Sequence, residues 1–447
     1  MTFLPHTDQD RQQMLAAIGV SQLDDLFDAV PANLRFPALD LPAGISEMEV
    51  MTELQALADA TVNAHQFTSF LGAGAYDHFI PSVVDHVLSR SEFYTAYTPY
   101  QPEVSQGTLQ AIFEFQSHIC NLTGMEVANA SVYDGASALA EAVNMALNHH
   151  RDKRDRVVLA PTIHPHYRDT VETYLRGTDV EVIGPQGFTE GMQALADSID
   201  ERTALVAVQY PDFLGHINDY QPVALAAQAA GALLCVVVNP IALGLLEPPS
   251  AIGADIVVGE GQPLGIPLSF GGPYLGLFAT RQEYVRKMPG RLVGETTDDR
   301  GQRGYVLTLT PREQHIRRER ATSNICTNQG LMALAAGVYL TVMGRQGLRQ
   351  VAELCYHKAH YAAEQINALP GYRLWNQRPF FHEFVIETPQ PVDWINRQLL
   401  ESRIIGGYDL SQWQPSLSNH MLVAVTERNT RADIDRLVSA LAEVGNG

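Results

Sequence analysis

The chain has 447 residues, and 30 lysines and arginines against 50 aspartates and glutamates give it a formal net charge of −20. This acidic balance argues against nucleic acid as a partner, because phosphate binding needs a basic face. Hydrophobic residues make up 46% of the chain and charged residues 18%, which is typical of a globular protein. No apolar run approaches the ~20 residues that span a bilayer, so we expect no membrane partner.

Composition and turn signals divide the chain into three predicted parts. Residues 1–65 are expected to form an N-terminal helical arm that several prolines interrupt. Residues 66–325 are predicted to form a large α/β domain, in which short apolar runs alternate with amphipathic helices. Residues 326–447 are predicted to form a smaller α+β domain with two long helices first and two strands later.

The short apolar runs of the large domain are rich in valine and do not alternate with polar residues. This pattern is typical of a parallel sheet that is covered on both faces. In such a sheet, ligands bind beyond the carboxyl ends of the strands. The predicted strands are residues 157–160, 180–183, 204–208, 233–238, 255–258 and 274–279.

Two segments in the first half of the chain could carry function. The segment Tyr94–Gly107 combines tyrosines with prolines and has no amphipathic pattern, which is typical of interface and ligand loops, although a buried structural loop has the same composition. The residues Gly135, Ala136 and Ser137 open a predicted helix and could cradle an anion with their N–H groups. The same residues could equally form a simple turn that caps the helix.

Two polar residues follow predicted strands and could face a ligand. His164 comes after the strand that ends at Ala160, and Asn239 ends the apolar strand 233–238. His164 could also be an ordinary loop histidine, and Asn239 could cap its strand through its own backbone. His164 and His166 lack a third metal ligand with sensible spacing, so we expect no metal site.

Two further segments are unusual for their composition. Residues 253–273 hold six glycines and three prolines after a strand, which indicates a long ordered loop with a functional role. Residues 310–324 form a dense arginine cluster in an acidic chain. Arginine clusters bind carboxylates or phosphates through paired N–H donors, but a solvated charged helix is the alternative.

Cysteine and lysine counts narrow the chemistry further. The four cysteines show no CxxC spacing, so they predict free thiols in a reducing compartment, and the start of the chain lacks the features of a secretory signal. We therefore expect a cytoplasmic location. The chain has only three lysines, Lys153, Lys287 and Lys358, and none follows a buried strand into a glycine-rich loop. None is therefore placed as a reactive amine.

Together these segments resemble the fold-type-I family of pyridoxal-phosphate (PLP) enzymes, and more specifically the P-protein (glycine decarboxylase) family of the glycine cleavage system. The segment Tyr97–Gly107 matches the family signature almost letter for letter, and residues 129–131, 253–273, 288–291 and 320–327 also match. The resemblance implies a large, mainly parallel sheet domain with a smaller C-terminal α+β domain. It also implies an enzyme that decarboxylates glycine with PLP and passes the aminomethyl group to the lipoyl group of H-protein.

The departures from the family pattern concern the cofactor residues. Gly135, Ala136 and Ser137 fit the phosphate loop and His164 fits the histidine that stacks on the PLP ring. Asn239 occupies the position of the aspartate that pairs with the pyridine nitrogen, and an amide cannot hold that proton as a carboxylate does. The position of the Schiff-base lysine falls on Gln262 or Pro263, neither of which can form an imine.

The resemblance therefore implies the separate first (alpha) subunit of the family, with no catalytic residue of its own and a vestigial cofactor pocket. PLP is then expected in a lysine-bearing beta subunit, in an α2β2 assembly. Three alternatives stay open: a stand-alone PLP-dependent lyase or transferase, a non-catalytic scaffold subunit, and a binding module that holds PLP or another phosphate non-covalently through Gly135–Ser137. The residues expected to line the shared site or interface are Tyr97, Tyr100, Gln101, Glu103, Gln106, Arg317, Arg318, Thr322, Ser323 and Asn324.

Overall fold

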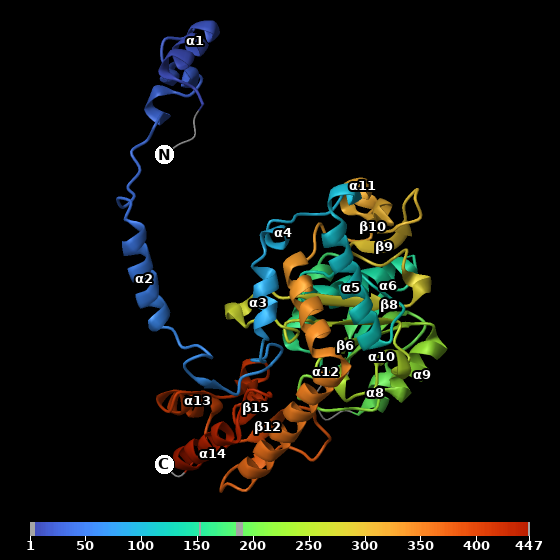
Figure 1. Cartoon of the computed structure of the whole chain (residues 1–447). Coiled ribbons are helices and arrows are strands. Elements are labelled where there is room, and N and C mark those ends of the chain that lie inside the picture. Colours follow the sequence, from blue (N-terminus) through green and yellow to red (C-terminus); the bar gives the residue numbers. More distant parts are fainter. Residues whose placement is uncertain (1–4, 152, 185–190, 446–447) are drawn as a thin grey trace. The chain divides into compact units, whose positions relative to one another are not determined.

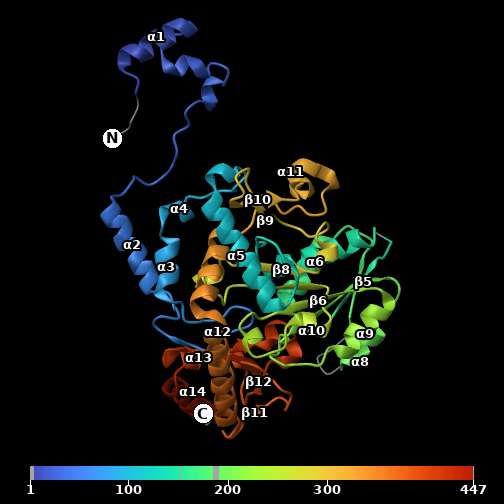
Figure 2. The same cartoon turned by 45° about the vertical axis from the view of Figure 1, so that its right-hand side comes forward.

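The computed structural model describes residues 5–151, 153–184 and 191–445. It separates into two compact units, Met1–Val62 and Asn63–Gly447. The elements of each unit are drawn in Figures 1 and 2, coloured along the sequence.

The first unit contains the helices α1 (Asp8–Ile18) and α2 (Glu47–Asp59) with two short 3-10 turns between them. Each helix begins with a capping box, formed by Thr7 with Asp10 and by Ser46 with Glu49. None of the described residues of this unit is buried, and many of its large apolar side chains are exposed.

The second unit is built on a seven-stranded sheet with the order β2-β8-β7-β6-β5-β3-β4. The five strands from β7 to β4 are parallel. At one edge β8 pairs antiparallel with β7, and β2 pairs antiparallel with β8, so only β8 runs against the other strands of this sheet. Every residue of β6 and β7 is buried, as the unalternating apolar runs predict. The strands are β2 (Val127–Ala128), β3 (Arg156–Leu159), β4 (Glu181–Ile183), β5 (Thr203–Tyr210), β6 (Leu233–Val238), β7 (Ile256–Glu260) and β8 (Gly276–Thr280).

Helices connect the strands as βαβ crossovers and cover the sheet (Figure 2). The helix α6 (Gly135–His149) packs along β5 to β8, and α9 (Gln221–Ala230) packs on β5 and β6. The helix α5 (Gln106–Thr123) packs on β2, β8 and the antiparallel hairpin of β9 (Leu292–Thr297) and β10 (Arg303–Thr308). The other helices of this part are α3 (Ser82–Leu88), α4 (Ser91–Tyr94), α7 (Pro165–Leu175), α8 (Met192–Asp197), α10 (Pro249–Ile252) and α11 (Gln314–Arg317).

The long helix α12 (Gly330–Asn367) leads from the large sheet into the C-terminal part (Figure 1). The sequence predicts two long helices here, and the structure joins them across a kink at Gly344, whose φ of 58° suits a residue without Cβ. By length and composition alone α12 could cross a membrane. A core helix passes the same test, and α12 buries side chains such as Tyr339 and Ile366 in the two hydrophobic cores.

The C-terminal part has its own hydrophobic core around a four-stranded antiparallel sheet with the order β11-β12-β15-β14. The segment before the large sheet also reaches this part, because β1 (Thr68–Ser69) pairs with β13 (Ile404–Ile405). The other elements are β11 (Arg373–Leu374), β12 (Glu383–Glu387), α13 (Val392–Glu401), β14 (Tyr408–Asp409), β15 (His420–Ala424) and α14 (Arg431–Gly445).

Candidate functional site

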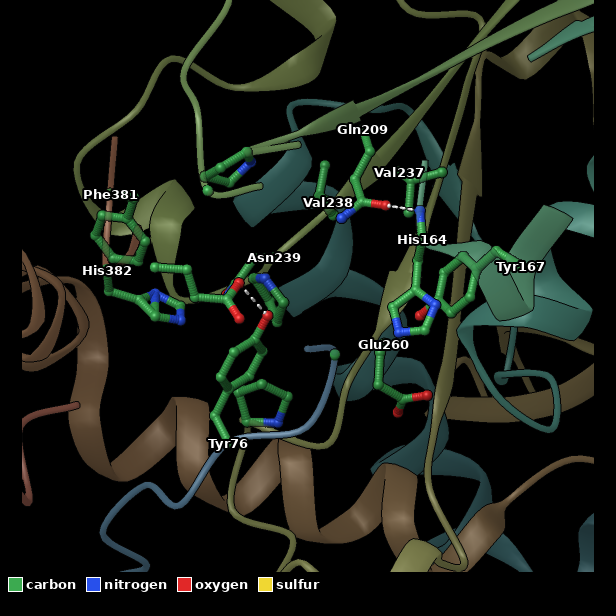
Figure 3. A pocket seen from close by; sticks show the side chains of 16 residues that line it. Tyr76, His164, Tyr167, Gln209, Val237, Val238, Asn239, Glu260, Phe381 and His382 are labelled. Carbon is green, nitrogen blue, oxygen red and sulfur yellow. Dashed lines mark hydrogen bonds between the residues drawn. The ribbon is translucent and has the colours of Figure 1, made fainter. Parts of the chain in front are cut away.

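A cavity of about 40 Å³ lies at the carboxyl ends of β3, β5, β6 and β7, the edge where a parallel sheet binds ligands. Three of the predicted pocket residues line it, namely His164, Asn239 and Pro263. Figure 3 shows His164 and Asn239 on opposite sides of the space, with Glu260 below the histidine ring. The rest of the lining comes from β5 and β6, from the loop of Gly74 and Tyr76, and from residues 381–383.

The predicted anion cradle at the start of α6 is already occupied by carboxylates of the chain. Glu260 accepts hydrogen bonds from the backbone N–H groups of Gly135 (3.0 Å), Gln262 (3.0 Å) and Leu275 (2.9 Å). Asp134 caps the same helix by accepting from the N–H of Ser137 at 2.7 Å. Burial raises the pKa of Glu260 to about 7, while the N–H donors oppose this shift.

An aromatic side chain also covers this cradle. A Cβ added to Gly135 would lie 2.1 Å from the hydroxyl oxygen of Tyr167, so this hydroxyl sits directly above the helix start. The ring of Tyr167 stacks on His164 at a centroid distance of 5.0 Å (Figure 3). The histidine predicted to stack on a cofactor therefore stacks on a tyrosine of its own chain.

His164 has both ring nitrogens engaged. Its Nε2 lies 2.8 Å from the backbone oxygen of Ala73, and its Nδ1 accepts from the N–H of His166 at 3.1 Å. Burial lowers the pKa of His164 to about 4, so the ring is neutral near pH 7 and Nε2 carries the hydrogen. A neutral, fully bonded imidazole has no donor or acceptor left for a ligand.

Gln262, at the predicted lysine position, is buried and ties the chain to itself. Its side-chain oxygen accepts from the N–H of Tyr76 (2.9 Å), and its amide nitrogen donates to the carbonyl oxygens of Tyr76 (3.0 Å) and Ile266 (2.8 Å). The hydroxyl of Tyr76 in turn donates to Glu383 at 2.8 Å, and Glu383 also accepts from the N–H of Ala73. These bonds hold the Tyr76 segment against the cavity.

Asn239 is the least constrained of the predicted pocket residues. Its side-chain oxygen accepts from the N–H of Ile241 at 3.0 Å, which caps the end of β6 as the local reading allowed. Ala136 and Ser137, the other members of the predicted cradle, lie in the first turn of α6 and do not line the cavity.

The predicted interface segments are much more open than the cavity. Tyr97 is 84% exposed and Tyr100 50%. Gln101, Glu103, Arg317, Arg318 and Asn324 are also exposed, whereas Thr322 and Ser323 are half-buried. Gln106 is exposed but bonded, because its amide pairs with both the N–H and the carbonyl of Tyr305 in β10. An apolar groove of about 210 Å³ runs beside Tyr97, between α5 and the start of α12.

A buried cluster next to the cavity joins residues far apart in the sequence. The carboxylate of Glu427 accepts from the N–H of Phe79 (2.6 Å) and the thiol of Cys355 (3.4 Å), and it lies 2.7 Å from Nδ1 of His78. The donor atoms of His78, Cys355 and Glu427 lie within 4.8 Å of one another, a spacing that a metal ion could also use. The hydrogen bonds account for this geometry without a cation.

Comparisons with known proteins agree with the sequence resemblance. A family model described as glycine cleavage system P-protein matches residues 1–441. Two relatives are each named probable glycine dehydrogenase (decarboxylating) subunit 1. The one from Desulforamulus reducens is 56% identical over 99% of this chain and 100% of its own length, and the one from Chlorobium limicola is 54% identical over the same shares. The chain belongs to the glycine cleavage system P-protein family.

Solved structures support the same conclusion for the fold. A crystal structure of a glycine decarboxylase (P-protein) in inhibitor-bound form matches with a TM-score of 0.90 and 42% identity, over 99% of this chain and 100% of that one. A sphingosine-1-phosphate lyase of Burkholderia pseudomallei shares the fold alone, with a TM-score of 0.65 and 16% identity over 92% and 94% of the two chains. The predicted P-protein resemblance and fold-type-I class are therefore confirmed.

PLP, the cofactor that the fold implies, does not fit the pocket of this P-protein chain. A space of about 40 Å³ holds a few water molecules, not a pyridine ring with a phosphate. Glu260 and Asp134 place two carboxylates where the phosphate would need N–H groups, and like charges repel a phosphate there. None of the three lysines lines the cavity. Lys287 donates to Asn148, and Lys358 donates to the carbonyl of Glu427.

The residues that close the pocket were not predicted. Glu260, Tyr167, Tyr76 and Glu383 were not singled out, because their roles depend on partners 100 or more residues away or on the next helix. A signal existed for Glu260, since an acidic residue that ends an otherwise apolar strand, Ile256–Glu260, must find donors when it is buried. No comparable local signal marks Tyr167.

Proposed function

We propose that this chain is the first of two different subunits of a glycine decarboxylase and that PLP resides in the second subunit. The observation that carries the proposal is the closed pocket, in which Glu260, Tyr167 and Gln262 take up the phosphate, ring and lysine positions. Relatives named subunit 1 support a second subunit as the partner. In the complete enzyme, glycine is decarboxylated and its aminomethyl group passes to the lipoyl group of H-protein.

The contribution of this chain is then a surface rather than a reacting group. The exposed segment 97–106 and the arginine segment 312–327 lie against one framework, because Gln106 pairs with β10 and Arg312 donates to the carbonyls of Met288 and Gly290 just before β9. We propose that both segments contact the second subunit and complete its active site. An α2β2 assembly would provide two such sites.

Reconstitution tests this assignment directly. The purified chain is expected to bind no PLP and to show no glycine–bicarbonate exchange, alone or with lipoylated H-protein. Mixing with the second subunit is expected to produce exchange that saturates at equimolar subunits. PLP bound as an imine in the isolated chain would contradict the proposal and favour a stand-alone enzyme. Full activity of the second subunit without this chain would instead indicate a scaffold role.

A further inference from the structure

Arg291 lies between the two proposed interface segments and contacts both of them. Its Nη2 donates to the hydroxyl oxygen of Tyr100 at 3.2 Å and to the carbonyl of Cys326 at 2.7 Å. Its Nη1 donates to the hydroxyl oxygen of Thr327 at 3.3 Å. The carboxylate of Glu313 lies 3.6 Å from Nε. One guanidinium thus touches the tyrosine segment and both ends of the arginine segment.

The guanidinium is buried, although the residues it holds are at the surface. Arg291 is only 7% exposed, whereas Tyr100 is 50% exposed. The ring of Tyr100 lies against the cation, with 5.5 Å between the guanidinium carbon and the ring centroid, and against His315 at 6.0 Å. A buried cation is costly unless it is paired, so this arrangement persists only if its partners stay in place.

The backbone of Arg291 fixes this group to the core of the large domain. Its carbonyl oxygen accepts from the N–H of Ala130, and β9 begins at the next residue, Leu292. The planar guanidinium presents its donors in a rigid fork, so it can set the direction of several acceptors at once. A lysine at this position would keep the charge but could not reproduce that fork.

We propose that Arg291 is a positioning residue that joins the segments 97–106 and 312–327 into one surface for the second subunit. The inference rests on the proposed function, because it assigns those segments to the subunit contact. Arg291 itself is buried and acts on the surface through Tyr100 and through Cys326 and Thr327 at the end of the arginine segment. Its role is therefore to fix the shape of the contact and not to take part in the reaction.

The test compares Arg291→Gln and Arg291→Lys with a matched control, Arg154→Gln. Arg154 is also partly buried and donates to two carbonyls, of Thr203 and Ala230, but it joins the opposite end of the sheet. In the isolated chain, Arg291→Gln is expected to raise amide hydrogen exchange in both segments together, while exchange in β5 and β6 stays unchanged. Arg154→Gln is expected to leave both segments unchanged.

The same variants are then titrated with the second subunit. Losing hydrogen bonds from a charged donor is expected to raise the apparent Kd for the second subunit about tenfold to a hundredfold. Arg291→Lys is expected to fall between Arg291→Gln and wild type, and added guanidinium is expected to restore part of the affinity of Arg291→Gln. At saturating chain, the KM for glycine is expected to stay within about twofold of wild type, because the residue acts through the contact.

The outcomes separate the two proposals. If the wild-type chain does not activate the second subunit, the proposed function is wrong. Amide hydrogen exchange in the isolated chain then decides by itself whether Arg291 couples the two segments. If the wild-type chain activates the second subunit, but Arg291→Gln binds that subunit as tightly as wild type and shows the same slow amide hydrogen exchange in both segments, the inference is wrong. If Arg291→Gln does not fold, Arg291→Lys is tested in its place. Wild-type affinity of Arg291→Lys for the second subunit would show that the forked geometry of the guanidinium is not needed.

Discussion

The cavity at the carboxyl ends of the strands and the surface around Tyr97 and Arg317 differ in how their polar side chains are bonded. Around the cavity, several buried polar side chains are bonded to another part of the chain, as Gln262 is to Tyr76, Glu260 to Gly135 and Glu383 to Tyr76. At the surface, tyrosine and arginine side chains project outward with few internal partners. The difference shows that side chains of the chain itself fill the space at the carboxyl ends of the strands, whereas the surface around Tyr97 and Arg317 is left exposed to solvent.

The substitution Gln262→Lys in the closed cavity is expected to have the largest effect. A lysine there would lose three hydrogen bonds and bury an unpaired charge, so we expect a loss of about 3–5 kcal/mol in the free energy of unfolding and no gain of PLP. Denaturant unfolding and PLP absorbance measure both effects. The control Gln110→Lys, exposed on α5, is expected to change stability by less than about 0.5 kcal/mol. Stoichiometric imine formation by Gln262→Lys would show that the pocket is open.

Glu383 makes the closed cavity sensitive to pH. Burial raises the pKa of Glu383 to about 7 from its usual 4.5, so the folded chain binds a proton that the unfolded chain has released. Stability from this group is present below pH 4.5 and is lost as the pH rises to about 7, for a total of about 3 kcal/mol. Unfolding of Glu383→Gln across this range should show a correspondingly flatter pH dependence.

Glu427 provides a control, because its pKa is shifted in the opposite direction from that of Glu383. Burial acts to raise its pKa, but the hydrogen bond and charge of His78 and the N–H of Phe79 lower the pKa of Glu427 to about 2. Its contribution is present above pH 4.5 and is lost as the pH falls toward 2. Glu427→Gln should therefore alter only the acid side of the curve. A variant of Glu383 that left the slope between pH 4.5 and 7 unchanged would refute its assigned role.

At the exposed surface, Arg317→Ala is expected to lower the activity of the mixture with the second subunit without changing the stability of the isolated chain. Arg317 is exposed, and among the described residues its guanidinium donates to the carbonyl of Pro311, so the isolated chain should unfold within about 0.5 kcal/mol of wild type. In the mixture with the second subunit, exchange activity is expected to fall about tenfold, as for an arginine at an interface. Arg349→Ala, an exposed arginine paired with Glu353 on α12, is the control and should not affect activity.

Tyr97→Phe should give the smallest effect. Removing one hydroxyl from a side chain that is 84% exposed should leave the isolated chain unchanged and weaken the second subunit's binding about threefold to tenfold. Tyr174→Phe removes a hydroxyl from another exposed tyrosine on α7 and should leave binding unchanged. Equal affinity of wild type and Tyr97→Phe would remove this hydroxyl from the contact.

The sequence predicted which cofactor residues were missing but not what replaced them. Asn239 and Gln262 can each be identified from a single position of the sequence. The parallel sheet can be predicted from the valine-rich runs of β5, β6 and β7 alone. The contact of Glu260 with Gly135 spans 125 residues, and Tyr167 reaches the same cradle from a different helix. Arg291 lay within a recognised motif, but its role depends on packing between three segments that no local pattern reveals.

The closed pocket also limits how this chain can evolve. Opening the pocket to PLP would need changes at Glu260, Tyr167, Gln262 and Asn239, and a change at Glu260 or Gln262 alone leaves buried backbone groups without partners. Each first step costs stability and gains no chemistry. Opening this pocket to a cofactor therefore requires several changes at once, because the buried side chains depend on one another for their partners.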